Sequence, residues 1–209
     1  MFRAGLPHEV ALSTGEWLFV DLGFSRIARS CGIAFGGNQP EAVTFAEMVE
    51  EVVSACTSPG GPLCLLLEAP LSVAFSSDGN PTGRRPERNG SKHRYWYSGL
   101  GASVLTSATY LLRAIADSPP KRDIILFEGF ASFKPRGTPS SHVGDVARLR
   151  DVVWDPAAHQ GAVLGPDALA ANPTDRLMSA FAVAGMDYGL PTVVHIDAAL
   201  SRYPPVHAP

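Results

Sequence analysis

The segment PLCLLLEAP, from Pro62 to Pro70, constrains the fold more than any other part of the sequence. It is a short, nearly unbroken apolar run between prolines, which is typical of a central strand covered on both faces. A second run, DIILFEGFASF from Asp123 to Phe133, predicts another buried strand. Buried strands of this kind need helices on both faces of their sheet, so the sequence predicts an α/β domain.

The other apolar segments complete a mixed sheet. The run from Trp17 to Leu22, a polar turn and the run CGIAF predict two antiparallel strands. Apolar residues near helical spacing predict helices over Pro40 to Cys56, Gly101 to Ser118, Ser140 to Gln160 and Asn172 to Leu190. A length of 209 residues gives no reason to divide the chain, so we expect one domain over residues 1–209, with a proline-rich tail at 197–209.

Composition excludes several classes of protein. A net charge of -3 argues against coating nucleic acid through bulk charge but leaves room for a local basic patch. Three cysteines without a C-x-x-C pair support neither a disulfide framework nor a cysteine zinc site. No segment resembles a signal peptide or a membrane span, so we expect a soluble, cytoplasmic protein without a membrane partner.

Three carboxylates interrupt or border apolar segments, where a charge without a partner is costly. Asp21 lies in the first strand, Glu68 ends the central strand, and Asp175 opens the last predicted helix. Burying an unpaired carboxylate costs several kcal/mol, so converging acids need protons, cationic side chains or a metal. Mg²⁺ or Mn²⁺ would fit such a group, and a pair of these ions can activate water for phosphodiester hydrolysis.

The segments FVDLGFSRIARSCGIAF, LLLEAPLS and NPTDRLMSAFAVAG together resemble the ribonuclease H-like superfamily. They look most like a branch of predicted nucleases catalogued as domain of unknown function four-two-nine, and more distantly like Holliday-junction resolvases. The resemblance implies a mixed five-stranded sheet whose first three strands are antiparallel, with helices on both faces. It also implies that Asp21, Glu68 and Asp175 hold catalytic metal and that many members have a fourth acid. Glu128, which follows an apolar strand, is the candidate for this catalytic acid, whereas the alternative, Asp187, lies twelve residues beyond Asp175 on the same predicted helix. The sequence departs from the family after Asp175, where Arg176 and Leu177 stand in place of a second acid.

Residues 76–99 form a long segment rich in glycine, proline and charge, which is typical of a functional loop. Its run RRPERNGSKHR, followed by YWY, places basic groups beside aromatic rings, as phosphate contact and base stacking require. The candidate substrate-binding residues are Arg84, Arg85, Arg88, Lys92, Arg94, Tyr95 and Trp96. The alternative is a solvated loop whose aromatic side chains pack onto the core. Among the histidines, including His142 and His159, we find no zinc spacing.

Each acid also has a structural interpretation. Asp21 could accept hydrogen bonds from the turn that follows it, Glu68 could pair with an arginine of the long loop, and Asp175 could cap a helix. We therefore expect a metal-dependent nuclease that uses Mg²⁺ or Mn²⁺, with nucleic acid as its partner and room for a dimer or a larger protein partner. The alternatives are a non-catalytic domain of the same fold that binds nucleic acid or protein, and a hydrolase of small phosphoesters or nucleotides.

Overall fold

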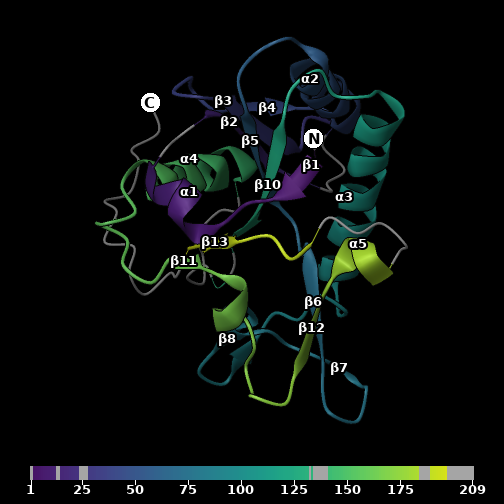
Figure 1. Cartoon of the computed structure of the whole chain (residues 1–209), viewed down its shortest axis with the longest axis vertical. Helices are drawn as coiled ribbons and strands as arrows, with labels where there is room; N and C mark the ends of the chain where they lie inside the picture. The colour runs from purple at the N-terminus through teal and green to yellow at the C-terminus, as the bar shows by residue number, and fades with distance from the viewer. Residues whose placement is uncertain are drawn as a thin grey trace.

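A mixed β-sheet crosses the centre of the molecule, with helices on both sides of it (Figure 1). The computed structural model describes residues 2–12, 15–23, 28–131, 133, 141–183 and 189–196. Within these ranges the sheet has the order β11-β13-β10-β5-β2-β3-β4, and β1 also pairs with β10. Its strands are β1 (Phe2–Ala4), β2 (Glu16–Asp21), β3 (Cys31–Phe35), β4 (Glu41–Val43), β5 (Leu63–Glu68), β10 (Ile124–Phe130), β11 (Val163–Leu164) and β13 (Val193–His195).

Strand direction brings several chain segments to one edge of this sheet. β3 is antiparallel to both β2 and β4, whereas β5 is parallel to β2 and to β10, and β13 is parallel to β10. In register, Asp21 lies opposite Glu68, which lies opposite Gly129 on its other side. One strand further along, Phe130 lies opposite His195. The carboxyl ends of β2, β5, β10 and β13 therefore form one border, which we call the carboxyl edge.

The side chains of β5 are buried on both faces of the sheet, which explains the apolar run in the sequence. Leu63, Leu65 and Leu67 lie in the core beneath α2 (Phe45–Thr57) and α3 (Leu100–Asp117). Cys64 and Leu66 lie in the opposite core, beneath α4 (His142–Trp154) and α1 (Pro7–Leu12). Alternate residues of a strand point to opposite faces, so both cores draw on the same short segment. The predicted α/β class with a mixed sheet is confirmed.

Two details of the sheet differ from the sequence-based expectation. The described residues give it eight strands rather than five, because β1, β11 and β13 extend it beyond β10. The helix predicted from Pro40 begins at Phe45, because Glu41–Val43 pairs with β3 instead. A capping box fixes this start: Thr44 Oγ1 accepts from the Glu47 backbone N–H, and a Glu47 carboxylate oxygen accepts from the Thr44 backbone N–H.

The predicted last helix, Asn172 to Leu190, is wrong. Residues Arg176–Ser179 form strand β12, which pairs antiparallel with β6 (Ser72–Phe75), and among the described residues of this segment the helical ones are Ala180–Val183, helix α5. Pairing with β6 outweighs the helical spacing of the apolar residues, since tertiary contacts override local pattern.

In the described parts of the chain no helix is long and apolar enough to cross a membrane.

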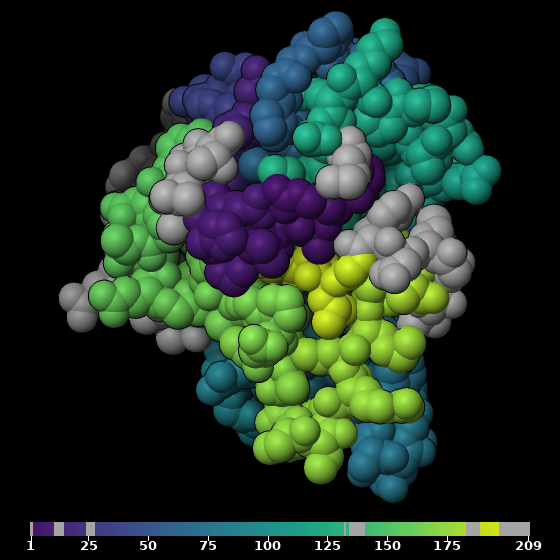
Figure 2. Space-filling view, in the orientation of Figure 1, coloured from purple at the N-terminus to yellow at the C-terminus, as the bar shows by residue number. Residues whose placement is uncertain are grey.

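A small lobe extends below the main sheet and contains most of the long basic segment (Figure 2). There β6 joins β12 to β7 (Pro81–Thr82), and a 3-10 turn (Arg85–Glu87) leads to the hairpin of β8 (Arg88–Asn89) and β9 (Lys92–His93). A second 3-10 turn, Pro166–Ala168, comes from the other side of the lobe. The Arg85 backbone N–H donates to the Leu169 carbonyl, which ties the two segments together.

The three cysteine thiols are buried and free, so we predict that they are inert in the folded protein. Burial raises the pKa of Cys56 and of Cys64 from 9.0 to about 12, and it also raises the pKa of Cys31. Because the thiolate is the reactive form, Cys56 and Cys64 should react with Ellman's reagent about a thousandfold more slowly in the native protein than in urea. Release of thionitrobenzoate measures this directly, and rapid reaction of either thiol in native buffer would contradict the prediction.

Candidate metal centre

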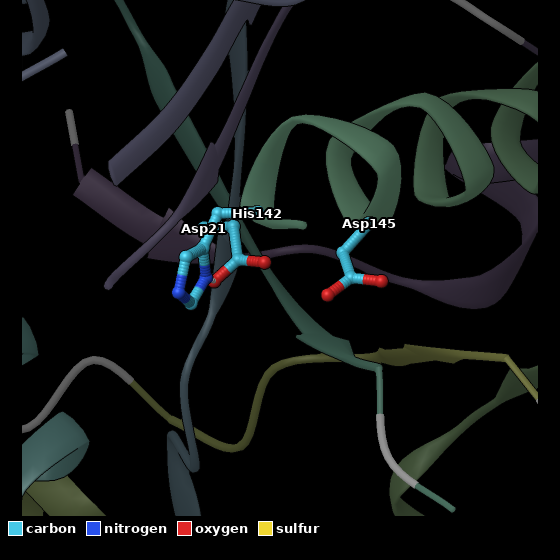
Figure 3. A group of neighbouring side chains, drawn as sticks. All are labelled: Asp21, His142 and Asp145. Atoms are coloured by element: carbon cyan, nitrogen blue, oxygen red, sulfur yellow. Dashed lines mark hydrogen bonds and ion pairs between the residues drawn. The ribbon is translucent and has the colours of Figure 1, made fainter. Parts of the chain in front are cut away.

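Three side chains that carry metal-ligating atoms converge at the carboxyl edge, and a fourth residue, Glu68, lies in register with one of them. Asp21 is the last residue of β2 and Glu68 the last residue of β5, while His142 and Asp145 lie in the first turn of α4. Figure 3 shows the carboxylates of Asp21 and Asp145 facing the same space, with the His142 ring against Asp21. One ligand atom from each of Asp21, His142 and Asp145 lies within 4.8 Å of the other two. A single cation placed among them could contact all three after small adjustments.

The alternation of β-strands explains why Asp21 and Glu68 point toward α4. Phe19 and Leu66, two residues before each acid, lie in the core beneath α4. Side chains two residues apart share a face, and residues in register on neighbouring strands lie about 5 Å apart. Asp21 and Glu68 therefore lie side by side on the face where α4 begins.

The start of α4 sets the positions of the other two ligands. The hydroxyl of Ser141 accepts a hydrogen bond from the Gly144 backbone N–H at 3.1 Å, which caps the helix. Because His142 and Asp145 are three residues apart, they lie on one side of its first turn. Gly32 of β3 lets the helix start come close to the sheet, since a Cβ atom there would lie 2.5 Å from the His142 carbonyl oxygen.

Two of the carboxylates in this site are buried. Asp21 is 2 % exposed and Asp145 is 3 % exposed. A carboxylate oxygen of Asp21 lies 2.8 Å from Nδ1 of His142, and Arg148 lies 3.7 Å from an Asp145 oxygen. Glu68 accepts a hydrogen bond from the Ala131 backbone N–H at 3.0 Å. Burying two carboxylates this close together is costly, and a bound cation would offset that cost.

Glu128 does not join this group, because it points to the opposite face of the sheet. Its neighbour Phe127 lies in the core beneath α4, so Glu128 faces the other way. There its carboxylate is fully buried, 2.7 Å and 2.8 Å from two guanidinium nitrogens of Arg84, and it accepts from the Leu71 backbone N–H at 2.9 Å. The structure thus gives Glu128 a structural partner in place of the predicted metal-site role.

Arg84 requires a second correction, because the predicted contact with substrate needs an accessible side chain. Arg84 is 0 % exposed. Its guanidinium donates to Ser72 at 2.6 Å and to Glu87 at 3.1 Å, in addition to Glu128. These contacts leave the side chain no surface for a nucleic-acid strand.

Asp175 also lies apart from the other predicted ligands. It precedes β12, and its carboxylate accepts hydrogen bonds from the backbone N–H of Asn172 at 3.0 Å and from the Asn172 side-chain amide at 3.1 Å. The residue of β12 that lies nearest the main sheet is Ser179, which pairs with Ser72. Asp175 is four residues earlier in the chain, about 13 Å farther away along the strand direction. These hydrogen bonds place Asp175 in a turn before a strand, so the structure supports neither the predicted metal ligand nor the predicted helix cap.

The remaining predicted substrate-binding residues lie on or near the surface of the lobe. Arg85, Lys92 and Arg94 are exposed, while Arg88, Tyr95 and Trp96 are half-buried. The rings of His93, Tyr95 and Tyr97 stack in sequence, with centroids 5.1 Å and 5.3 Å apart. Trp96 packs instead on Phe75, at 6.2 Å. The segment thus combines both interpretations: a buried anchor at Arg84 and a basic, aromatic surface beyond it. Asp187, the alternative position for the fourth acid, lies outside the described residues.

His142 and Asp145 were missed as candidate ligands. Their signal is the pattern Ser-His-x-x-Asp in SHVGD, which puts a capping serine before a histidine and an acid at helical spacing. A search for zinc spacing among histidines alone does not find it.

Comparison of the chain with protein-family models, with curated proteins and with solved structures gave no match.

Proposed function

We propose that this chain is a metal-dependent nuclease whose centre consists of Asp21, Glu68, His142 and Asp145. The observation that carries the proposal is the convergence of Asp21, His142 and Asp145 within 4.8 Å, with Glu68 in register beside Asp21. Elements distant in sequence supply these residues, and two of the carboxylates are buried. Burying such a group without a cation costs free energy of folding, and with a cation the group can act as a catalytic metal centre.

The strand arrangement supports a ribonuclease H-like fold as part of this proposal. β2, β3 and β4 form an antiparallel series, and β5 and β10 continue the sheet parallel to β2. That is the arrangement implied by the resemblance of the sequence to the ribonuclease H-like superfamily. In this fold the acids on the first strand, the fourth strand and a late helix correspond to Asp21, Glu68 and Asp145. Helix α4 then takes the role predicted from the sequence for the helix over residues 172–190.

The proposed reaction is hydrolysis, in which water attacks phosphorus and the bond to the leaving oxygen breaks. A bound Mg²⁺ or Mn²⁺ supplies an activated water and charge stabilisation at the phosphate. The residues of the chain hold and orient this centre: the Ala131 N–H fixes Glu68, and Asp21 fixes the His142 ring. An imidazole among the ligands favours Mn²⁺ over Mg²⁺, because Mg²⁺ binds oxygen ligands and retained waters in preference to nitrogen.

Binding of nucleic acid without cleavage is the second candidate function. It is favoured by the stacked rings of His93, Tyr95 and Tyr97 beside exposed basic residues, since such surfaces bind single strands without any chemistry. Cleavage assays separate the two functions.

Asp145→Asn should reduce cleavage about a hundredfold or more, because it removes a charged ligand from the centre. The assay measures initial rates on labelled single-stranded and duplex DNA and RNA, with Mn²⁺, with Mg²⁺ and with EDTA. Bis-p-nitrophenyl phosphate reports hydrolysis of small phosphoesters in the same series.

The matched control is Asp151→Asn, on the same helix but outside the cluster, and it should cleave at the wild-type rate. Cleavage that persists in EDTA, or an equal loss in both variants, would contradict the proposal. Binding of oligonucleotides without any turnover would favour the second candidate instead.

A further inference from the structure

A pocket of about 410 Å³ opens where the small lobe meets the main sheet. One wall comes from Arg85 and Arg88 at the start of the lobe, and the other includes His195, the last residue of β13. Phe130, opposite His195, follows Gly129, which lies opposite Glu68. The pocket therefore shares the carboxyl edge with the metal centre. Two strand spacings, about 10 Å, separate the His195 end of β13 from Glu68.

The chemistry of the pocket suits an anionic ligand with a flat apolar part. The nine described residues that line it include two arginines and no acid. Phe133, Leu164 and Ile196 supply an apolar surface, and Asn89 supplies an amide. Arginine matches phosphate geometry, and an aromatic face supports stacking of a base. A volume of this size accommodates one nucleotide but not a duplex.

The two arginines are held in place while their donors remain available. Arg88 donates from one terminal nitrogen to Thr82 at 3.2 Å, and its Nε is buried without a hydrogen-bond partner among the described residues. Arg85 is exposed, and it forms no ion pair with any described acid. Its backbone is anchored by the Leu169 carbonyl and by the neighbouring buried network of Arg84. A phosphate in the pocket would therefore meet two cations, one with its side chain held by Thr82 and one with its backbone held by Leu169.

Phe133 is held in a backbone conformation that aromatic residues rarely adopt. Its φ is +61°, in the left-handed region. Its ring packs edge-on against Phe130, with centroids 6.3 Å apart, and the Arg94 guanidinium lies 5.9 Å from its centroid. Backbone conformations of this kind concentrate at binding sites, where other contacts maintain them. The same guanidinium would add a third cation beside the pocket.

We propose that this pocket binds one unpaired nucleotide of a single-stranded nucleic acid, with its phosphate on Arg85 and Arg88 and its base on Phe133. The role of the pocket rests on the proposed function: the bound nucleotide would hold a strand whose neighbouring phosphodiester reaches Asp21 and Glu68. It narrows the substrate class to single strands, or to junctions and ends with an unpaired nucleotide. Binding itself needs no metal.

Fluorescence anisotropy of labelled single-stranded DNA and RNA oligonucleotides in EDTA tests the pocket without cleavage. The Kd should rise about tenfold in Arg85→Ala and in Arg88→Ala, and the slope of log Kd against log salt should fall by about 1 in each. Phe133→Leu should raise the Kd about tenfold, whereas Phe133→Tyr should keep wild-type affinity because the ring remains. The control is Arg113→Ala, an exposed arginine of α3 paired with Asp117, which should bind as the wild type does.

Failure of this inference is distinguishable from failure of the proposed function. Loss of binding in the pocket variants, with thermal unfolding unchanged, supports the pocket even where the wild type cleaves nothing. Wild-type affinity in Arg85→Ala and Arg88→Ala overturns the pocket even where cleavage is normal. Equal affinity for a fully paired duplex, or no binding of any single strand by the wild type, overturns it as well.

Discussion

Asp21→Asn should abolish metal-dependent cleavage, with a loss of about a thousandfold in rate. Asp21 lies at the centre of the proposed site, in register with Glu68 and 2.8 Å from His142. The substitution removes a charged ligand but keeps an amide of the same shape, and metal centres supply several kcal/mol of charge stabilisation to phosphoryl transfer. Initial rates on the best oligonucleotide substrate in Mn²⁺ give the measurement.

The same variant should fold as stably as the wild type in buffer without metal. Asparagine can still hydrogen-bond to His142, and removing one buried negative charge relieves repulsion between acids. Addition of Mn²⁺ should raise the Tm of the wild type but not that of the variant, because a ligand that binds only the folded state stabilises it. The control is Asp78→Asn, an exposed residue of the lobe. A wild-type cleavage rate in Asp21→Asn would contradict the proposed role.

Arg84→Ala should destabilise the protein by about 3–5 kcal/mol, the largest effect on stability that we predict. Arg84 is the cationic partner of two carboxylates buried around it, Glu87 and Glu128. Removal of a buried partner leaves uncompensated charge, which costs more than the pair contributes. Urea unfolding followed by circular dichroism measures the change, provided that the m value stays constant.

The adjacent residue provides the control for this variant. Arg85 is exposed, so Arg85→Ala should change the free energy of unfolding by no more than about 0.5 kcal/mol. A deficit of similar size in both variants, or none in Arg84→Ala, would contradict the role assigned to the buried network.

The pH dependence of the Arg84→Ala deficit follows from the same network. Burial raises the pKa of Glu87 above its ordinary value of 4.5, so the folded state binds this proton more tightly than the unfolded chain does. The contribution of Glu87 to stability is therefore greatest below pH 4.5 and declines as pH rises through the raised pKa. Loss of the Arg84 charge, which lowers the pKa of Glu87, raises that pKa further and makes the free energy of unfolding depend more strongly on pH. The loss of stability in Arg84→Ala relative to the wild type should therefore be smaller at acid pH than at neutral pH.

Local sequence information predicted the central strands and two of the candidate ligands. The short apolar run around Leu65, bounded by prolines, is typical of a strand covered on both faces, and the structure buries it in this way. Asp21 and Glu68 stood out because a charge at the end of such a run needs a partner. Their adjacency required only that the first and central strands be neighbours, which holds for many mixed sheets.

The other site residues depended on information that local pattern does not contain. The orientation of Glu128 depends on which alternate residues of β10 face α4, and that is set by the strand's place in the sheet. The burial of Arg84 depends on Glu128, 44 residues away in sequence. The segment around Leu177 has helical spacing, yet β12 forms because a partner strand, β6, is in place. His142 and Asp145 carried a local signal that becomes evidence only once the start of α4 is known to lie beside Asp21.

A crystal soaked in Mn²⁺ and measured at the manganese absorption edge tests the central proposal most directly. We predict an anomalous peak at the carboxyl edge, about 2.2 Å from carboxylate oxygens of Asp21 and Asp145 and close to a ring nitrogen of His142. The peak should be absent in a soaked crystal of Asp21→Asn. A wild-type crystal with no manganese among these residues, or with peaks only elsewhere on the protein, would contradict the proposed metal centre.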